Sequence, residues 1–294
     1  MAGMKLGPFT LDVIETGRFR LDAGAMFGVV PRTLWSRVVD VDEKGRMTLA
    51  SRCLLIRSEA SGRTYLIDNG CGDKFDEKMS GIYAIDQDHS ELVQSLEAVG
   101  VNPVEVTDLI FTHLHFDHCG GTTYYDEDAS GSARLQERFP NAYYHVTKEH
   151  LATVREPNAR EIASFLPENV ETILGSDRLH PVGEKHVWEE GLFAIPSDGH
   201  TVGMQLPVIE TEGKRLVFCA DLLPTVHHFP LPWVMAYDME PLKTLDQKPG
   251  FLRRAIDQGW YLFMEHDPDH EVVRLERDGK KIRVAESVSL GEIG

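Results

Sequence analysis

The chain has 294 residues, of which 42% are hydrophobic and 26% charged, a composition typical of a globular protein that can bury a substantial core. Its net charge of −17 would repel a phosphate backbone, so we expect a small-molecule substrate and no nucleic-acid partner. No apolar stretch approaches the roughly 20 residues that a membrane-spanning helix needs, so no membrane partner is expected either.

The beginning of the chain and its cysteines favour the cytoplasm. The opening segment, MAGMKLGPFTLDV, lacks an apolar run of the length found in secretory signals. The four cysteines are scattered and form no CxxC pair, which disfavours a disulfide framework or a cysteine zinc cluster. Cys219 lies in the apolar run RLVFCA and is expected to be a buried thiol.

The first half of the chain predicts strands, then a helix, then a further strand. Short β-type runs over 52–57 and 64–67 are bounded by polar turns, and the second ends at the glycine-rich segment DNGCG. Apolar residues at helical spacing predict a helix over 90–99, with Ser90 as its N-cap and Gly100 as its stop. A strand over 106–111 follows.

The second half alternates in the same way. The spacing of apolar residues predicts helices over 134–139, 147–154 and 251–258. Strands are predicted over 192–195, 205–210, 215–219 and 260–264. Strand runs surrounding occasional helices indicate a layered α/β domain, and no linker or repeat divides the chain, so we expect a single domain over 1–294.

Ligand-type side chains crowd into one segment, THLHFDHCGG, directly after a predicted strand. His113 and His115 are two residues apart, so a strand would direct both to the same side. Asp117 and His118 follow where the chain must turn, and the glycine pair allows tight backbone there. Imidazole nitrogen together with a hard carboxylate oxygen suits zinc, and also iron or manganese.

Three later positions could complete the metal shells. His200 follows a strand in the turn SDGHT, Asp221 ends the strand FCAD, and His266 ends the strand FMEHD. Each projects a ligand from a loop at the carboxyl end of a strand, where α/β sites tend to lie. Alone, each would more often be an ordinary loop residue, but together with the first cluster they indicate a metal centre.

The combination HxHxDH, GHT, AD and a terminal EHD resembles the metallo-β-lactamase superfamily over nearly the whole chain, from about Leu54 to about His266. The resemblance implies a four-layer αββα sandwich with metal ions at one edge of two facing sheets. It also implies a supporting role for Asp68, at the end of an early strand. Seven ligands are implied: His113, His115 and His200 on the first ion, Asp117, His118 and His266 on the second, and Asp221 bridging both.

The implied chemistry is hydrolysis by two divalent ions, with zinc as the first expectation and iron, manganese or cobalt as alternatives. Such ions share a water, lower its pKa and let the bridging hydroxide attack a carbonyl or phosphoryl centre. Asp117, beside the second ion, is the candidate catalytic proton shuttle. The chain carries no GxSxG elbow for a serine nucleophile.

Among the branches of the superfamily, the chain resembles the lactonases that open acyl-homoserine lactones. Few residues follow His266, which leaves no room for the C-terminal domain of glyoxalase II, and the acidic charge disfavours nucleases. Apolar segments near 25–35 and 227–237 resemble the walls of the lactonase substrate pocket, although core packing or a homodimer interface would explain them too. The expected pocket residues are Met26, Phe27, Trp35, His227, His228, Trp233 and Tyr237.

Two departures and two alternatives accompany this hypothesis. Thr201 is followed by Val-Gly-Met, so the second histidine of the common GHTPGH pattern is missing, and Pro224 replaces a tyrosine that binds the substrate carbonyl in some lactonases. His227, His228 or Tyr237 could substitute for that tyrosine. A phosphotriesterase or other ester hydrolase of the same fold is one alternative, and an iron-dependent oxidoreductase such as a persulfide dioxygenase is the other. The remaining histidines are treated as structural or surface residues.

Overall fold

The computed structural model describes residues 3–85, 91–127 and 132–293, and these residues form two compact units. The first unit contains residues 1–17 and 51–183, and the second contains residues 18–50 and 184–294. Two long strands, β2 (Phe9–Asp22) and β3 (Arg46–Ser58), each contribute residues to both units. Among the described residues, no helix is long and apolar enough to cross a membrane. The single-domain assignment over 1–294 stays a prediction.

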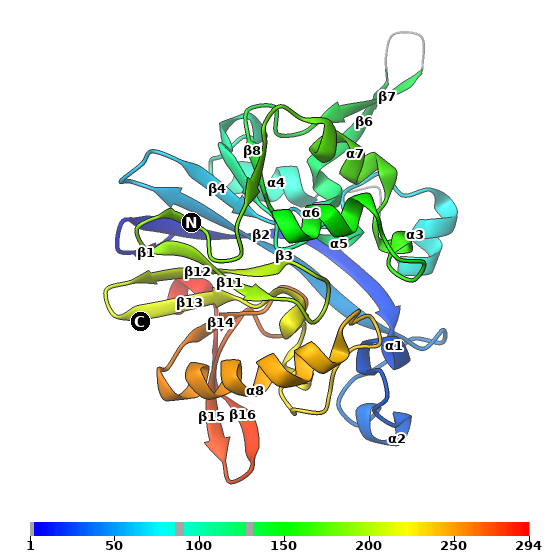
Figure 1. The fold of residues 1–294 in the computed structure, drawn as a ribbon, viewed down its shortest axis with the longest axis vertical. Helices are drawn as coiled ribbons and strands as arrows, with labels where there is room; N and C mark the ends of the chain where they lie inside the picture. Colours follow the sequence, from blue (N-terminus) through cyan, green and yellow to red (C-terminus); the bar gives the residue numbers. More distant parts are fainter. Residues whose placement is uncertain (1–2, 86–90, 128–131, 294) are drawn as a thin grey trace. The chain divides into compact units, whose positions relative to one another are not determined.

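The first sheet has seven strands in the order β1-β2-β3-β4-β5-β8-β9 (Figure 1). Its remaining strands are β1 (Met4–Leu6), β4 (Thr64–Ile67), β5 (Asp108–Ile110), β8 (Tyr143–Thr147) and β9 (Leu179–Val182). The pairs β4–β5, β5–β8 and β8–β9 are parallel, so these strands bring their carboxyl ends to one edge of the sheet. The strands predicted over 52–57, 64–67 and 106–111 are confirmed as parts of β3, as β4 and as β5.

Helices cover the first sheet and complete its core. They are α3 (Glu77–Tyr83), α4 (Glu91–Ala98), α5 (Phe116–Cys119), α6 (Lys148–Arg155) and α7 (Pro167–Gly175). Helix α4 buries Leu92 and Leu96 in the same apolar cluster as Leu66 and Leu109 of the sheet. The helix predicted over 147–154 is confirmed as α6, and its N-cap is Thr147, whose side chain accepts a hydrogen bond from the backbone of the first turn. The predicted cap of α4, Ser90, lies outside the described residues.

The helix predicted over 134–139 is wrong. Residues Ala133–Glu137 form strand β7, which pairs antiparallel with β6 (Thr123–Glu127) in a separate two-stranded sheet. Most of β7 is exposed, so no buried apolar face decides its conformation, and good helix formers such as Leu135 and Gln136 give way to the ladder of hydrogen bonds with β6.

The second unit contains a seven-stranded sheet in the order β10 to β16. Strands β13 and β14 pair in parallel, and the other neighbours that pair do so antiparallel. The strands are β10 (Val187–Glu189), β11 (Leu192–Ser197), β12 (Met204–Thr211), β13 (Lys214–Phe218), β14 (Tyr261–Phe263), β15 (Val272–Asp278) and β16 (Lys281–Val288). The four strands predicted here are confirmed as β11, β12, β13 and β14, and Cys219 is buried as expected.

The second unit also holds α1 (Ala23–Phe27), α2 (Arg32–Trp35) and the long helix α8 (Pro241–Asp257), which packs against β15 (Figure 1). Helix α8 begins ten residues before the predicted start at 251, and Pro249 lies within it. Its buried side chains recur at helical spacing: Thr244, Lys248, Phe251, Leu252 and Ala255. Packing of this face outweighs the local cost of an internal proline, which is why the sequence pattern underestimated the helix.

Candidate metal centre

In the first unit, the histidine cluster occupies a loop and a short helix rather than a strand. Strand β5 ends at Ile110, His113 and His115 lie in the following loop, and Asp117 and His118 lie on α5. The expectation that a strand directs the first two histidines to one side is therefore wrong. Their rings still converge, with centroids 4.5 Å apart for His113–His115 and 3.9 Å apart for His113–His118.

Asp68 holds this loop in place from the end of β4. Its carboxylate accepts hydrogen bonds from the Thr112 amide at 2.8 Å and the Thr112 hydroxyl at 2.6 Å, and it lies 3.0 Å from His118 Nδ1. Burial raises the pKa of Asp68, while His118 and Thr112 oppose the rise. The backbone of Asp68 has a φ of +55°, a strained value of the kind found at functional sites. Asp68 thus positions the loop that carries the predicted metal ligands.

Two further residues fix the same loop. Glu161, only 2% exposed, lies 3.3 Å from His115 Nε2 and accepts a hydrogen bond from Asn158 at 3.1 Å. The His150 ring accepts a hydrogen bond from the Leu114 amide at 2.8 Å. The expectation that His150 is structural agrees with this contact. Glu161 carries no recognisable signal in the sequence, because it stands 46 residues from His115 along the chain.

The glycine pair after α5 is required by close packing. A Cβ atom on Gly120 would lie 2.0 Å from the Cys71 carbonyl oxygen, and one on Gly121 would lie 2.3 Å from the Asn69 carbonyl oxygen. Neither glycine has a positive φ. Their role is therefore to let the chain after the metal ligands approach the segment that follows β4.

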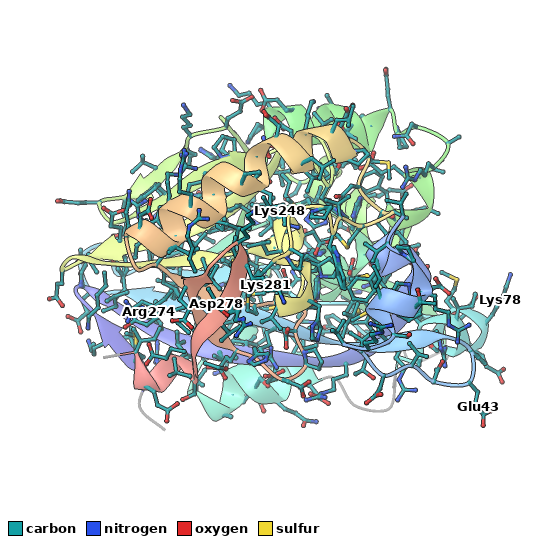
Figure 2. All side chains as sticks on the ribbon, turned by 90° about the horizontal axis from the view of Figure 1, so that it is seen from below. Glu43, Lys78, Lys248, Arg274, Asp278 and Lys281 are labelled. Atoms are coloured by element: carbon teal, nitrogen blue, oxygen red, sulfur yellow. The ribbon has the colours of Figure 1, made fainter. Side chains whose placement is uncertain are left out.

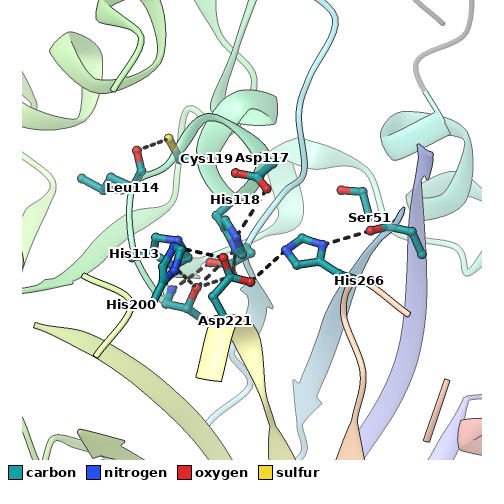
Figure 3. A network of polar contacts seen from close by, with 12 residues as sticks. Ser51, His113, Leu114, Asp117, His118, Cys119, His200, Asp221 and His266 are labelled. Carbon is teal, nitrogen blue, oxygen red and sulfur yellow. Dashed lines mark hydrogen bonds and ion pairs between the residues drawn. The ribbon is translucent and has the colours of Figure 1, made fainter. Parts of the chain in front are cut away.

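In the second unit, Asp221 lies between two predicted ligands. It follows β13 on the short 3₁₀ helix Ala220–Leu222, where Ala220 has a φ of +41°. One carboxylate oxygen lies 3.0 Å from His200 Nε2 and the other lies 3.3 Å from His266 Nε2 (Figure 3). Two donors that bind one tetrahedral ion lie roughly 3.3 Å apart, so these separations suit coordination.

The opposite nitrogens of these histidines have protein partners. His200 Nδ1 lies 3.2 Å from Asp238, which also accepts a hydrogen bond from the Thr244 hydroxyl at 2.9 Å. His266 Nδ1 donates to the Ala50 carbonyl oxygen at 2.9 Å. Sequence reasoning missed Asp238, which stands 38 residues from His200 in a segment without a recognisable motif.

The donor set of each unit fits divalent metal ions. In each predicted histidine ligand, one ring nitrogen faces a protein oxygen, an arrangement that fixes the tautomer and orients the opposite nitrogen for a metal. The oxygens belong to Thr112 for His113, Glu161 for His115, Asp68 for His118, Asp238 for His200 and Ala50 for His266. Imidazole nitrogens beside buried carboxylates match zinc, iron or manganese. All seven predicted ligands are buried.

Four of the expected pocket residues form an aromatic cluster in the second unit. The Phe27 ring stacks on His228 at 4.9 Å and on Trp35 at 5.9 Å, and it meets the Trp233 edge at 5.5 Å. His228 Nε2 donates to the Met26 carbonyl oxygen at 2.9 Å, and burial lowers the pKa of His228 to about 3, so its ring is neutral. Phe27, Trp35, Met26 and His228 are buried, while Trp233 is partly exposed.

His227 and Tyr237 are partly exposed. Burial lowers the pKa of His227. Their roles as substrate contacts, like the pocket as a whole, stay predictions.

Comparisons with known proteins agree with this geometry. A probable metallo-hydrolase of Mycobacterium tuberculosis is 23% identical over 269 residues, covering 78% of each chain. The solved structure of a probable metal-dependent hydrolase from Staphylococcus aureus is 28% identical, with a TM-score of 0.82, and the match covers 97% of this chain and 100% of that one. AidC, a dizinc quorum-quenching lactonase solved with the product N-hexanoyl-L-homoserine, is 19% identical, with a TM-score of 0.74 over 98% of both chains.

The likeness to AidC, at this low identity, shows the fold alone. The coarser prediction, a metallo-hydrolase, is supported by the matches in both sequence and structure. The family model described as the metallo-beta-lactamase superfamily matches residues 47–278, which include every predicted metal ligand. The chain therefore belongs to the metallo-β-lactamase superfamily and has the fold of that superfamily.

Proposed function

We propose that this protein is a binuclear metal-dependent hydrolase that opens lactones with an apolar acyl tail. His113, His115 and His200 would hold the first ion, Asp117, His118 and His266 would hold the second, and Asp221 would bridge them. Zinc is the proposed metal, in line with the donor set.

The observation that carries the proposal is the position of Asp221. Its two carboxylate oxygens face two different histidines, His200 at 3.0 Å and His266 at 3.3 Å. These histidines are assigned to different ions, so a carboxylate with one oxygen towards each is arranged to bridge. A carboxylate that served a single ion would not need both contacts.

Bound divalent ions would supply an activated water and polarise the substrate carbonyl. The residues of the chain supply the rest. Asp68, Glu161 and Asp238 orient imidazoles through their second nitrogens, which preserves the geometry of the centre. Asp117, buried on the first turn of α5, would accept a proton from the attacking water and return it to the departing oxygen.

Two features support a lactone as the substrate. The similar fold of AidC, described as a lactonase, provides the precedent. Trp233, the partly exposed member of the aromatic cluster, would contact the acyl tail, and the buried Phe27, Trp35 and His228 would support its ring from behind. His227 or Tyr237 would take the place of the missing tyrosine and bind the lactone carbonyl.

The test is a hydrolysis panel on zinc-loaded protein. We expect acyl-homoserine lactones to be hydrolysed, with kcat/KM rising over a short series of lengthening tails, since each added methylene contributes about 0.8 kcal/mol at most. An aryl phosphotriester should be turned over less well, and thioesters and β-lactams serve as further comparisons.

The Asp221→Asn variant should lose one ion and most of the hydrolytic rate. Asp246→Asn, on the exposed side of α8, should keep two bound ions and the full hydrolytic rate. Full activity of Asp221→Asn with two bound ions would contradict the bridge. Absence of lactone hydrolysis in the panel would remove the lactonase assignment and leave a metallo-hydrolase of another substrate class.

A further inference from the structure

The second unit contains an open groove of about 680 Å³ that shares no residue with the seven predicted ligands and shares Trp233 alone with the predicted substrate pocket. Its walls come from the segment 229–233, helix α8 and the β15–β16 hairpin. Most of the lining is apolar: Val38, Phe229, Pro230, Leu231, Pro232, Trp233, Pro249 and Ile282. The volume lies within the range of small-molecule sites, which are mostly apolar with a few polar groups.

The polar groups of this groove are all cationic. Arg253, Arg277, Lys280 and Lys281 line it, and no carboxylate does. In the described part of the chain, none of these four side chains forms an ion pair. The groove therefore presents a local positive field on an acidic protein.

One wall of the groove is held rigid from beneath. The buried Lys248 amino group donates hydrogen bonds to the Pro230 carbonyl at 3.0 Å and to the Trp233 carbonyl at 2.6 Å. Figure 2 shows Lys248 on α8 and Lys281 on the neighbouring hairpin. Prolines in the segment further restrict its backbone. A preformed wall lowers the entropic cost of binding a ligand.

We propose that this groove binds an amphipathic anion, namely a linear apolar chain that ends in a carboxylate. The chain would lie along Leu231, Trp233 and Ile282, and the carboxylate would meet the cations of the hairpin and α8. An uncharged hydrocarbon would leave the four cations unused, and a small polar anion would leave the apolar walls exposed. Charge complementarity together with the apolar lining therefore selects a ligand with both features.

The experiment is calorimetric titration of the zinc-loaded protein with decanoate, decan-1-ol and acetate. Decane-1-sulfonate, whose head group is a poor metal ligand, separates the groove from the metal centre. We expect decanoate and decane-1-sulfonate to bind with similar affinity, decan-1-ol to bind roughly tenfold more weakly, and acetate not to bind, because each exposed ion pair contributes up to a few-fold in affinity.

Matched variants assign the binding to the groove. Lys280→Gln combined with Lys281→Gln should reduce decanoate affinity to that of decan-1-ol. Lys214→Gln combined with Lys243→Gln removes the same charge elsewhere in the second unit and should leave affinity unchanged. Leu231→Asn should weaken the binding of all three ten-carbon probes alike.

Three results would overturn the proposal. The first is equal affinity for decanoate and decan-1-ol. The second is loss of decanoate binding in Asp221→Asn but not in the Lys280→Gln, Lys281→Gln double variant. The third is sedimentation that shows the protein to self-associate through the face that carries the groove. None of these depends on lactone hydrolysis, so a failure of the proposed activity is separable from a failure of the proposed site.

Discussion

At the scale of single residues, the carboxylates that contact the histidines support the predicted metal site as strongly as the predicted ligands themselves. The spacing of residues along the chain can indicate a metal ligand, as in the HxHxDH segment. Its supporting partner only has to be near in space, so Glu161 and Asp238 carry no sequence signal although they contact His115 and His200. All seven predicted ligands were accessible to sequence reasoning, but of these supporting carboxylates only Asp68 was.

Glu161→Gln should lower metal affinity at the site that contains His115. The amide keeps the size of the side chain but removes the negative charge that favours the donating tautomer of the imidazole, and changes of this kind cost about 10- to 100-fold in affinity or activity. Competition with a zinc chelator measures the effect. Glu149→Gln, on α6 of the same unit, is the matched control, and an unchanged zinc affinity in Glu161→Gln would show that the contact is not a supporting one.

At the scale of elements, prediction succeeded where one buried face sets the pattern and failed where packing between distant segments decides. Strands such as β4 and β12 consist largely of apolar residues that are buried in the structure, so their own sequence predicts them. Strand β7 depends on pairing with β6, and the first half of α8 depends on a face that only the folded unit buries. The loop after β5 depends on Asp68, which lies far from it in sequence.

Gly120→Ala should destabilise the protein, because its Cβ would meet the Cys71 backbone, which cannot rotate away as a side chain can. Overpacking of this kind costs roughly 1–3 kcal/mol of unfolding free energy. Urea denaturation measures the loss. Gly175→Ala is the control, since a Cβ at the end of α7 meets nothing within 4 Å, and equal stability of the two variants would contradict the close approach.

Lys248→Met should change the pH dependence of stability. Burial lowers the pKa of Lys248 from 10.5 to about 7, opposed by the charge of Asp238. Between these two values the unfolded chain binds the proton and the folded chain does not, so the free energy of unfolding rises with pH across this window by up to about 1.4 kcal/mol per unit. The methionine removes that contribution.

The slope of unfolding free energy between pH 7 and 9 measures the effect of Lys248→Met, in comparison with the unaltered protein. Lys243→Met, on the exposed side of α8, should keep the original slope. A slope that is the same in all three proteins would mean that Lys248 stays protonated when buried.

At the scale of the whole molecule, the predicted ligands divide between the two compact units. His113, His115, Asp117 and His118 belong to the first, and His200, Asp221 and His266 belong to the second. Metal bound by these residues would stabilise only the folded protein, because the unfolded chain does not keep its ligands in place. The metal centre proposed for catalysis is then also a source of stability.

Removal of metal should therefore lower the melting temperature as well as abolish hydrolysis. A ligand present at a hundred times its dissociation constant adds about 2.7 kcal/mol to the free energy of unfolding by mass action, and two ions add more. Scanning calorimetry of chelated and zinc-reloaded protein measures the shift, while elemental analysis should find two ions per chain. Asp221→Asn should show a smaller shift on chelation than the unaltered protein, because it has less metal to lose.

Full hydrolysis with a single bound ion, or a single iron in protein purified without added metal, would contradict the binuclear hydrolase and favour the iron-dependent oxidoreductase. A melting temperature that is indifferent to chelation, with both ions removed, would show that each unit is stable without metal and that the ions serve catalysis alone.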